Sequence, residues 1–251
     1  MPFSNTDRLE ISPALRRLNL ETTDSGCERL IDEMVESHGP RIVCFMNAHT
    51  FNMAWQFPAV RLDIHESTWI LRDGIGIALL LRMAGRHPGL NLNGTNFIPR
   101  LLNRYAGRKV IFAGSSSPWI GRAAENAGKL FQVDVVEVMD GFQEDRCYVE
   151  MVAQSEAEMV ILAMGTPKQE RIATLLKKNL DRDVLIVCGG GVVDFIGKKV
   201  FRAPGWAQRS GLEWVFRLVQ EFRRLWYRYL VGNPIFLIRA FLTRNSIHAK
   251  Q

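Results

Sequence analysis

Short apolar runs, rich in β-branched residues, alternate along this chain with longer stretches whose apolar residues recur at helical spacing. The longer stretches predict helices at residues 75–86, 97–105, 119–131, 145–154 and 168–178. The short runs predict strands at residues 41–47, 68–71, 109–113, 133–138, 159–163 and 184–188. These runs are apolar nearly throughout, as expected of strands that helices cover on both faces. The alternation therefore predicts an α/β fold with a mainly parallel sheet flanked by helices.

The pattern changes after Pro204, where the chain becomes aromatic and basic. A single helix over residues 213–230 would carry one polar stripe with Arg217, Arg224 and Arg228, opposite a broad apolar face. We therefore predict that these three arginines project together from one side of a C-terminal helix.

The Gly-Asn-Pro sequence at residues 232–234 predicts the end of this helix. The apolar stretch around it, residues 230–242, has 13 residues, whereas a membrane-spanning helix needs about 20. Such a stretch can lie in a membrane interface but cannot cross the bilayer. We predict an α/β domain at residues 1–204 and a helical, membrane-associating appendage at residues 205–251.

The distribution of charge along the chain indicates what kind of partner the C-terminal segment binds. The whole chain has a net charge of +6, and residues 205–251 alone, with eight basic and two acidic side chains, account for all of it. A basic tail on a neutral body favours an anionic partner: a membrane surface, a phosphate or a nucleic acid. Nucleic acid is the least favoured, because the basic residues are not spread over the body and the tryptophans follow one packing face.

The cysteines and the N-terminal residues indicate the compartment. The four cysteines are far apart and form no Cys-x-x-Cys pair, which is typical of reduced, buried thiols. The first residues have no long apolar core of the kind found in a signal peptide. We therefore expect a cytoplasmic protein.

Polar residues follow the predicted strands, where ligands of Rossmann-like sheets bind. Asp73, with Gly74 beside it, ends the second predicted strand, and its carboxylate can take a proton from an attacking hydroxyl. The alternative is that Asp73 caps the helix that begins near residue 75. Thr50 and Asn52 follow the first strand and can hydrogen-bond a sugar or nucleotide, or merely serve the turn.

Glycine-rich turns follow two further strands. Gly114 opens the turn at residues 114–117, and Gly190 lies in the turn at residues 189–191. Both suit a nucleotide diphosphate, because glycine lets the backbone approach a phosphate closely, but both can be purely structural. Neither has the spacing of an ATP-binding loop or a dinucleotide fingerprint, which counts against an ATPase or a dehydrogenase. Gln169 lies in the first turn of the helix predicted at residues 168–178, and we expect its side chain to point into the crevice beyond the strands.

No pattern in the sequence argues for a metal ion or another cofactor. No Asp-x-Asp pair follows a strand, and His49 and His65 have no neighbours with metal-ligand spacing. Basic side chains must then supply the positive charge that a diphosphate needs. Arg217, Arg224 and Arg228 are the candidates, with a solvated helix face as the alternative.

Six stretches, in the same order and at similar spacing, resemble the WecG/TagA/CpsF glycosyltransferase family from about residue 9 to residue 237. They are NAHTFN at 47–52, RDGIGI at 72–77, NLNGTNFIPRLL at 91–102, MGTPKQE at 164–170, GGGVVDFIGKKVFRAP at 189–204 and GLEWVFRLVQEFRRLWYRYL at 211–230.

The resemblance implies a metal-independent transferase that inverts the anomeric centre of a UDP-activated sugar, often of the N-acetylmannosamine type or its uronic acid. It implies a polyprenyl-diphosphate-linked saccharide as acceptor, at the cytoplasmic membrane surface, in bacterial surface polysaccharide biosynthesis. The proposed general base of the family matches Asp73, and its threonine and glutamine match Thr50 and Gln169. The arginine-rich C-terminal appendage of the family, which serves membrane attachment and helps to complete the site, matches Arg217, Arg224 and Arg228.

Two departures from the family pattern stand out. Where the family often reads Arg-x-x-Gly-x-Asp, this chain has Asn91, Gly94 and Asn96, so that two amides replace two charges. Asn91 is retained as a candidate substrate-binding residue. Phe222 stands where the family commonly has proline, which predicts a straighter helix here. The alternative function is a non-catalytic adaptor at the membrane surface, and the apolar face of the tail also allows a homo-oligomer.

Overall fold

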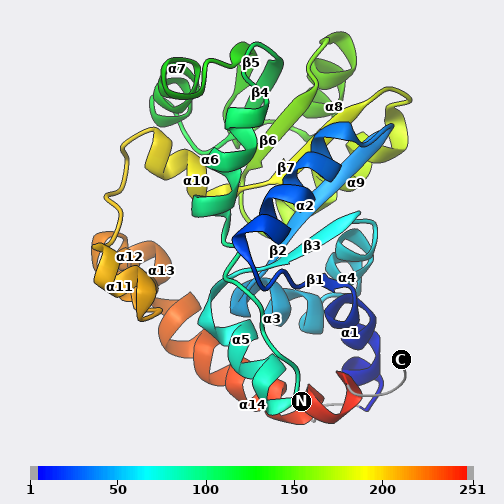
Figure 1. The fold of residues 1–251 in the computed structure, drawn as a ribbon, viewed down its shortest axis with the longest axis vertical. Helices are drawn as coiled ribbons and strands as arrows, with labels where there is room; N and C mark the ends of the chain where they lie inside the picture. The colour runs from blue at the N-terminus through cyan, green and yellow to red at the C-terminus, as the bar shows by residue number, and fades with distance from the viewer. Residues whose placement is uncertain (1–4, 248–251) are drawn as a thin grey trace.

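The structure is a computed structural model that describes residues 5–247, apart from the side chains of residues 5–10 and of Arg209. Its centre is a seven-stranded, wholly parallel sheet with the strand order β1-β3-β2-β7-β6-β4-β5 (Figure 1). The strands are β1 (Leu18–Asn19), β2 (Pro40–Met46), β3 (Trp69–Arg72), β4 (Lys109–Gly114), β5 (Asp134–Met139), β6 (Met159–Ala163) and β7 (Val184–Cys188). The predicted α/β fold is confirmed.

Six of these strands coincide with the predicted runs to within a few residues. The exception is β1, a two-residue edge strand that pairs Leu18 with Ile70 and Asn19 with Leu71. A strand of two residues has no periodicity of its own, so the sequence pattern could not reveal it.

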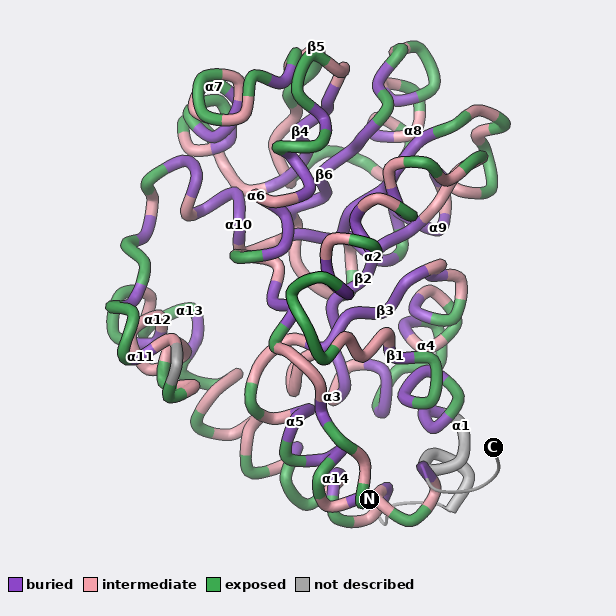
Figure 2. Tube along the Cα trace, in the orientation of Figure 1, coloured by how far each residue is buried: buried purple, intermediate pink, exposed green. Residues whose placement is uncertain are grey.

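Helices cover both faces of the sheet. Those before β7 are α1 (Asn5–Arg16), α2 (Asp24–Glu36), α3 (Ala48–Gln56), α4 (Pro58–His65), α5 (Gly74–Met83), α6 (Gly94–Arg104), α7 (Trp119–Phe131), α8 (Asp145–Gln154) and α9 (Lys168–Asn179), and α10 (Gly190–Ile196) follows β7. One core lies beneath α2, α6, α7 and α10, and a second beneath α8 and α9. Figure 2 shows these cores as the buried strands and the inner faces of the helices.

Local chemistry sets where several helices begin. The Asn47 side chain accepts the backbone N–H groups of His49 and Thr50, each at 3.0 Å, and so starts α3 directly after β2. The Asn93 side chain accepts the N–H of Asn96 at 2.9 Å and starts α6 in the same way. The Asn47 cap thus turns the chain into a helix directly at the carboxyl end of β2, which leaves a short polar loop there.

The prediction of a single helix over residues 213–230 is wrong. The chain instead forms α11 (Gly205–Arg209), α12 (Glu213–Gln220), α13 (Phe222–Trp226), the π-helix η1 (Tyr227–Val231) and α14 (Gly232–Ile247). The helix breaks at Glu221, whose φ of −127° and ψ of 41° are not helical. The straighter helix expected from Phe222 is therefore also wrong. Residues seven apart on a straight helix lie about 10.5 Å apart along its axis; in the structure, Arg217 and Arg224, on either side of the break, both contact Asp194 Oδ2.

The predicted helix end at residues 232–234 is wrong as well, because the backbone stays helical from η1 into α14. Pro234 is tolerated in the first turn of α14, where its missing N–H matters least. Among the described residues, no helix is long and apolar enough to cross a membrane.

Helix α14 packs against α1, α3 and α5 along the lower edge of the molecule (Figure 1). Its buried stripe contains Phe236, Ala240 and Ile247, which belong to a third core shared with α1, α3, α4 and α5. The helices α11–α13 stand apart from the sheet and are mostly exposed or half-buried (Figure 2). The predicted domain boundary at residue 204 stays a prediction. Lys250 of the basic segment and the Arg209 side chain lie outside the described part of the chain.

Candidate active site

A cavity of about 620 Å³ opens beyond the carboxyl ends of the parallel strands, where the C-terminal helices meet the sheet. Loops after β2, β3, β4, β6 and β7 line it together with side chains from α12, α13, η1 and α14. Eight of the eleven predicted site residues are in its wall: Asp73, Thr50, Gln169, Asn52, Gly190, Arg217, Arg224 and Arg228. Because these residues come from distant parts of the chain, their convergence makes this cavity the candidate active site.

Asp73 presents its carboxylate to the cavity instead of capping a helix. Although Asp73 precedes α5, its side chain makes no hydrogen bond to the first turn of that helix. The Asn47 side chain donates to Asp73 Oδ2 at 3.3 Å and holds the carboxylate in place. Burial raises the pKa of Asp73, against the opposing effects of the Asn47 hydrogen bond and of Arg228, Arg217 and Arg72. The geometry thus removes the capping alternative and leaves a carboxylate of raised proton affinity.

Thr50 and Gln169 line the same cavity as this carboxylate, but their polar groups are engaged within the protein. The Thr50 hydroxyl donates to Asn47 Oδ1 at 3.3 Å and lies 3.4 Å from the Thr166 hydroxyl. Gln169 Oε1 accepts the N–H of Gly165 at 3.1 Å, and its Nε2 donates to Glu170 Oε1 at 2.9 Å. Both side chains therefore shape the loops after β2 and β6.

Asn52 ties the body of the protein to its C-terminal helix. Its Nδ2 donates to the carbonyl oxygen of Gly232 at 2.7 Å. The Arg239 guanidinium donates in turn to the carbonyl and to the side-chain oxygen of Asn52, each at 3.1 Å. This side chain thus fixes the start of α14 at the edge of the cavity.

The other three predicted residues are not among those that line the cavity. Gly74, with a φ of +84°, donates its N–H to Asn91 Oδ1 at 2.8 Å, so Asn91 secures the turn directly after Asp73. A Cβ on Gly114 would lie 2.3 Å from the carbonyl carbon of Ala163, because β4 and β6 crowd together there. Contact of these residues with a substrate stays a prediction.

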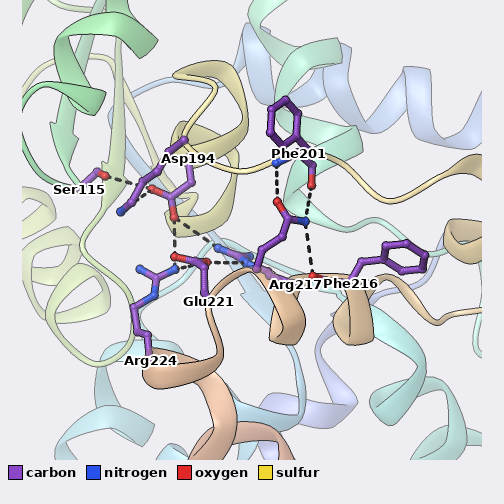
Figure 3. Close-up of polar contacts among 9 residues, drawn as sticks. Ser115, Asp194, Phe201, Phe216, Arg217, Glu221 and Arg224 are labelled. Carbon is purple, nitrogen blue, oxygen red and sulfur yellow. Dashed lines mark hydrogen bonds and ion pairs between the residues drawn. The ribbon is translucent and has the colours of Figure 1, made fainter.

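The three predicted arginines differ in their partners. Arg217 and Arg224 each place a guanidinium nitrogen 3.4 Å from Asp194 Oδ2 (Figure 3). Arg228 has no acidic partner at ion-pair distance among the residues that the structure describes. Burial lowers the pKa of Arg228, which nevertheless stays charged at neutral pH. At the cavity wall, Arg228 is therefore a cation whose charge no carboxylate of the described residues neutralises at close range.

Further lining residues were not singled out from the sequence as part of the site. Burial and the nearby Arg228 lower the pKa of His49 to about 4, so its imidazole is neutral at neutral pH. Phe142, in the loop after β5, is 79% exposed at the cavity wall. Asp194 and Lys199 follow the glycine turn after β7. The only sequence signal for these residues was their place just beyond predicted strands.

Comparison with known proteins identifies the family. Residues 16–250 match the glycosyl transferase WecG/TagA/CpsF family. The chain belongs to this family. It is 28% identical over 171 residues to an N-acetylglucosaminyldiphosphoundecaprenol N-acetyl-beta-D-mannosaminyltransferase of Bacillus subtilis (strain 168), and the aligned part spans 66% of each chain. The protein of the same name from Bacillus spizizenii (strain ATCC 23059 / NRRL B-14472 / W23) is 29% identical over 181 residues, which cover 70% of each chain.

This glycosyltransferase has one group of side chains with metal-ligand chemistry among its described residues. The ligand atoms of Cys44, Glu170 and Cys188 lie within 4.8 Å of one another, and all three residues are buried. Glu170 Oε1 already accepts hydrogen bonds from Gln169 and from Thr166. Of the three, Cys188 is also among the residues that line the cavity. Metal independence stays a prediction.

Proposed function

We propose that this family member transfers a sugar from a UDP-sugar to a polyprenyl-diphosphate-linked saccharide, with inversion at the anomeric carbon, in bacterial surface polysaccharide biosynthesis. One observation carries the proposal. The Asp73 carboxylate and the Arg228 guanidinium, which has no ion-pair partner within the described part of the chain, line the same cavity and interact electrostatically. A base and an anion site at one cavity are what an inverting transfer from a nucleotide diphosphate requires.

The reaction proceeds in one displacement. The acceptor hydroxyl oxygen attacks the anomeric carbon while Asp73 takes the hydroxyl proton. The bond from the anomeric carbon to the phosphate oxygen breaks, and UDP leaves with the bonding electron pair. Arg228, with Arg217 and Arg224 beside it, stabilises the charge that develops on the diphosphate. These residues supply the base and the positive charge without a metal ion.

The loops after the strands provide the rest of the donor site. A Cβ on Gly190 would lie 3.1 Å from Gln169 Oε1, so glycine at this position lets the loops after β6 and β7 lie close together at the cavity wall. The exposed Phe142 ring offers a stacking surface for a nucleobase. The two Bacillus relatives are named for an N-acetyl-mannosaminyl donor group and an N-acetylglucosaminyl-diphospho-undecaprenol acceptor. A donor of this type and an acceptor of this class are the first to test.

The exposed side of α14 supports a place at the inner face of the cytoplasmic membrane. Leu237, Ile238 and Phe241 lie opposite the buried stripe and are 46%, 54% and 56% exposed. Arg223, on α13, is exposed as well. An exposed apolar stripe next to basic side chains suits the interface of an anionic bilayer, where a lipid-linked acceptor resides.

The test is UDP release by the purified full-length protein, with a panel of UDP-sugars and a short polyprenyl-diphosphate saccharide. We expect release with a restricted set of donors, retained in EDTA, and lowered by about 100-fold or more in Asp73→Asn. Because burial raises the pKa of Asp73, kcat/KM should fall as the pH decreases through a value above that of a free aspartate.

Asp134→Asn is the control, since Asp134 is exposed on the edge strand β5, outside the cavity lining. Near-full turnover of a folded Asp73→Asn protein would refute the base assignment. UDP binding without release under any donor and acceptor would favour the non-catalytic adaptor.

A further inference from the structure

A buried carboxylate joins the C-terminal helices to the sheet at the edge of the cavity. Asp194 lies in α10, directly after β7, and its side chain is only 4% exposed. Its Oδ1 accepts the Ser115 hydroxyl at 3.0 Å and lies 3.5 Å from Lys199 Nζ, both from the α/β body. Its Oδ2 lies 3.4 Å from guanidinium nitrogens of Arg217 and Arg224, both from the C-terminal helices (Figure 3). Asp194 therefore connects two parts of the molecule.

The helices that carry these arginines have few other attachments. Leu218 is the only buried residue of α12, and Leu225 is the only one of α13 among the described side chains. Besides Asp194, the polar links of these helices are the pairing of the Gln220 side chain with the backbone of Phe201, at 2.7 and 2.9 Å, and the ion pair of Glu213 with Arg202 at 3.7 Å. Apolar burial contributes little here, so the ion pairs of Asp194 contribute a large part of the attachment.

A second carboxylate lies in the same cluster but has a different position in the chain. Glu221 contacts Arg224 at 2.6 Å and Arg217 at 3.5 Å, and its side chain is 11% exposed. Glu221 lies between α12 and α13, so its ion pairs connect the C-terminal helices only to each other. Asp194 and Glu221 thus give the arginines the same kind of counter-ion, but only Asp194 binds them to the body.

We propose that Asp194 is a positioning residue, the internal counter-ion that holds α12 and α13 closed over the cavity before the donor binds. It presets Arg217 and Arg224 at the place where the diphosphate of the donor lies. The second half of this proposal rests on the proposed function, whereas the closed state of the ligand-free protein does not. Without the carboxylate, part of the donor's binding free energy is consumed in closing the helices. The apparent Kd for the donor then equals the Kd of the closed state divided by the fraction of molecules that are closed.

The experiment compares backbone hydrogen exchange of the full-length, ligand-free protein with that of Asp194→Asn and Glu221→Gln. The asparagine oxygen can still accept the Ser115 hydrogen bond, while the charge is lost. We expect exchange in residues 213–226 to become about 10-fold faster or more in Asp194→Asn, as for the loss of a hydrogen bond between charged groups. Glu221→Gln removes an equal charge from the same cluster, so its exchange there should change less than 3-fold.

The kinetic part of the experiment separates positioning from chemistry. In Asp194→Asn, KM for the UDP-sugar should rise about 10-fold with kcat changed less than 3-fold, and UDP should slow exchange in residues 213–226 back toward the wild-type rate. Arg224→Gln, a substitution at a side chain that is 51% exposed, breaks the same link from the other side and should also speed exchange.

Equal exchange in Asp194→Asn and wild type would overturn the proposal, as would equal acceleration in the Glu221→Gln control. A fall in kcat without a change in exchange would also overturn it, since Asp194 would then act on the reacting groups. If the exchange result holds but no UDP-sugar is turned over, the proposed function fails while the closure by Asp194 stands.

Discussion

At the level of single residues, the buried carboxylates of this transferase differ in the cations that face them. Two arginines and a lysine lie within ion-pair distance of Asp194. Arg228 acts electrostatically on Asp73 from beyond ion-pair distance. Glu170, which is 2% exposed, has hydrogen bonds to Oε1 only, and its buried Oε2 has no hydrogen-bond partner. Burial raises the pKa of Glu170. The ionised form of Glu170, next to the cavity residue Gln169, therefore destabilises the folded protein.

This asymmetry predicts the effect of Glu170→Gln on stability. A raised pKa in the folded state means that Glu170 contributes its full stability below the unfolded pKa and loses it as the pH rises through the folded pKa. The substitution should therefore raise Tm at pH 8, by about 2–4 °C for each kcal/mol gained, and the gain should disappear toward pH 4. Thermal unfolding at both pH values measures this. A lower Tm at pH 8, or an equal gain at pH 4, would contradict it.

The residue scale also shows what a sequence can reveal about such a site. Asp73, Thr50 and Gln169 could be predicted because each follows a strand-like run, and parallel strands bring their carboxyl ends together. The hydrogen bonds that turn Gln169 toward its own loop depend on side-chain orientation, which no spacing encodes. Asp194 was missed as a site residue because three of its four partners lie 79, 23 and 30 residues away, beyond any local pattern.

At the level of elements, apolar periodicity predicted the five helices α5–α9 but missed α1–α4 and α10. The predicted helices at residues 119–131 and 145–154 have the bounds of α7 and α8. The same reasoning failed beyond residue 212, because a helical wheel assumes a straight helix and the break at Glu221 has neither glycine nor proline to signal it. Ion pairing across the break, which the wheel does not include, is what the sequence pattern could not show.

The packing of α14 leads to a prediction about stability. Phe236 is 1% exposed and meets the Phe51 ring at a centroid distance of 5.2 Å, while Phe222 is 55% exposed. We expect Phe236→Ala to lower the free energy of unfolding by about 3–5 kcal/mol, as for a fully buried phenylalanine. Phe222→Ala, which makes the same chemical change, should have an effect within about 0.5 kcal/mol. Urea denaturation compares the two, and equal losses would mean that α14 is not part of the body's core.

At the level of the whole molecule, the basic C-terminal segment, residues 205–251, combines positive charge with an exposed apolar stripe. The sequence places the entire net charge of +6 within residues 205–251. In the structure, Arg217, Arg224, Arg228 and Arg239 of this segment line the cavity. The exposed apolar stripe of α14, which contains Leu237, Ile238 and Phe241, faces away from the core in which Phe236 is buried. Under the proposed function, the arginines would face the donor diphosphate and the apolar stripe of α14 would face the bilayer that holds the lipid-linked acceptor.

This division predicts how the protein should bind membranes. Removing all residues after Pro204 would also remove Phe236 and Ile247 from the core, so point substitutions in the intact chain are the sharper test. Replacing Leu237, Ile238 and Phe241 together by glutamine should weaken sedimentation with phosphatidylglycerol vesicles by about 100-fold, since each apolar side chain gains about 1.5–3 kcal/mol on full burial and loses part of that at an interface.

The matched control replaces Leu62 and Leu130, which are 69% and 66% exposed on α4 and α7, by glutamine. Binding in this control should equal that of the wild type, and UDP release with a soluble short-chain acceptor should be unchanged in the α14 variant. If both variants bind vesicles equally well, apolar contact through α14 is excluded. Binding that then disappears in 0.5 M salt would identify the exposed arginines, such as Arg223, as the sole attachment, because added salt screens charges and leaves apolar burial intact.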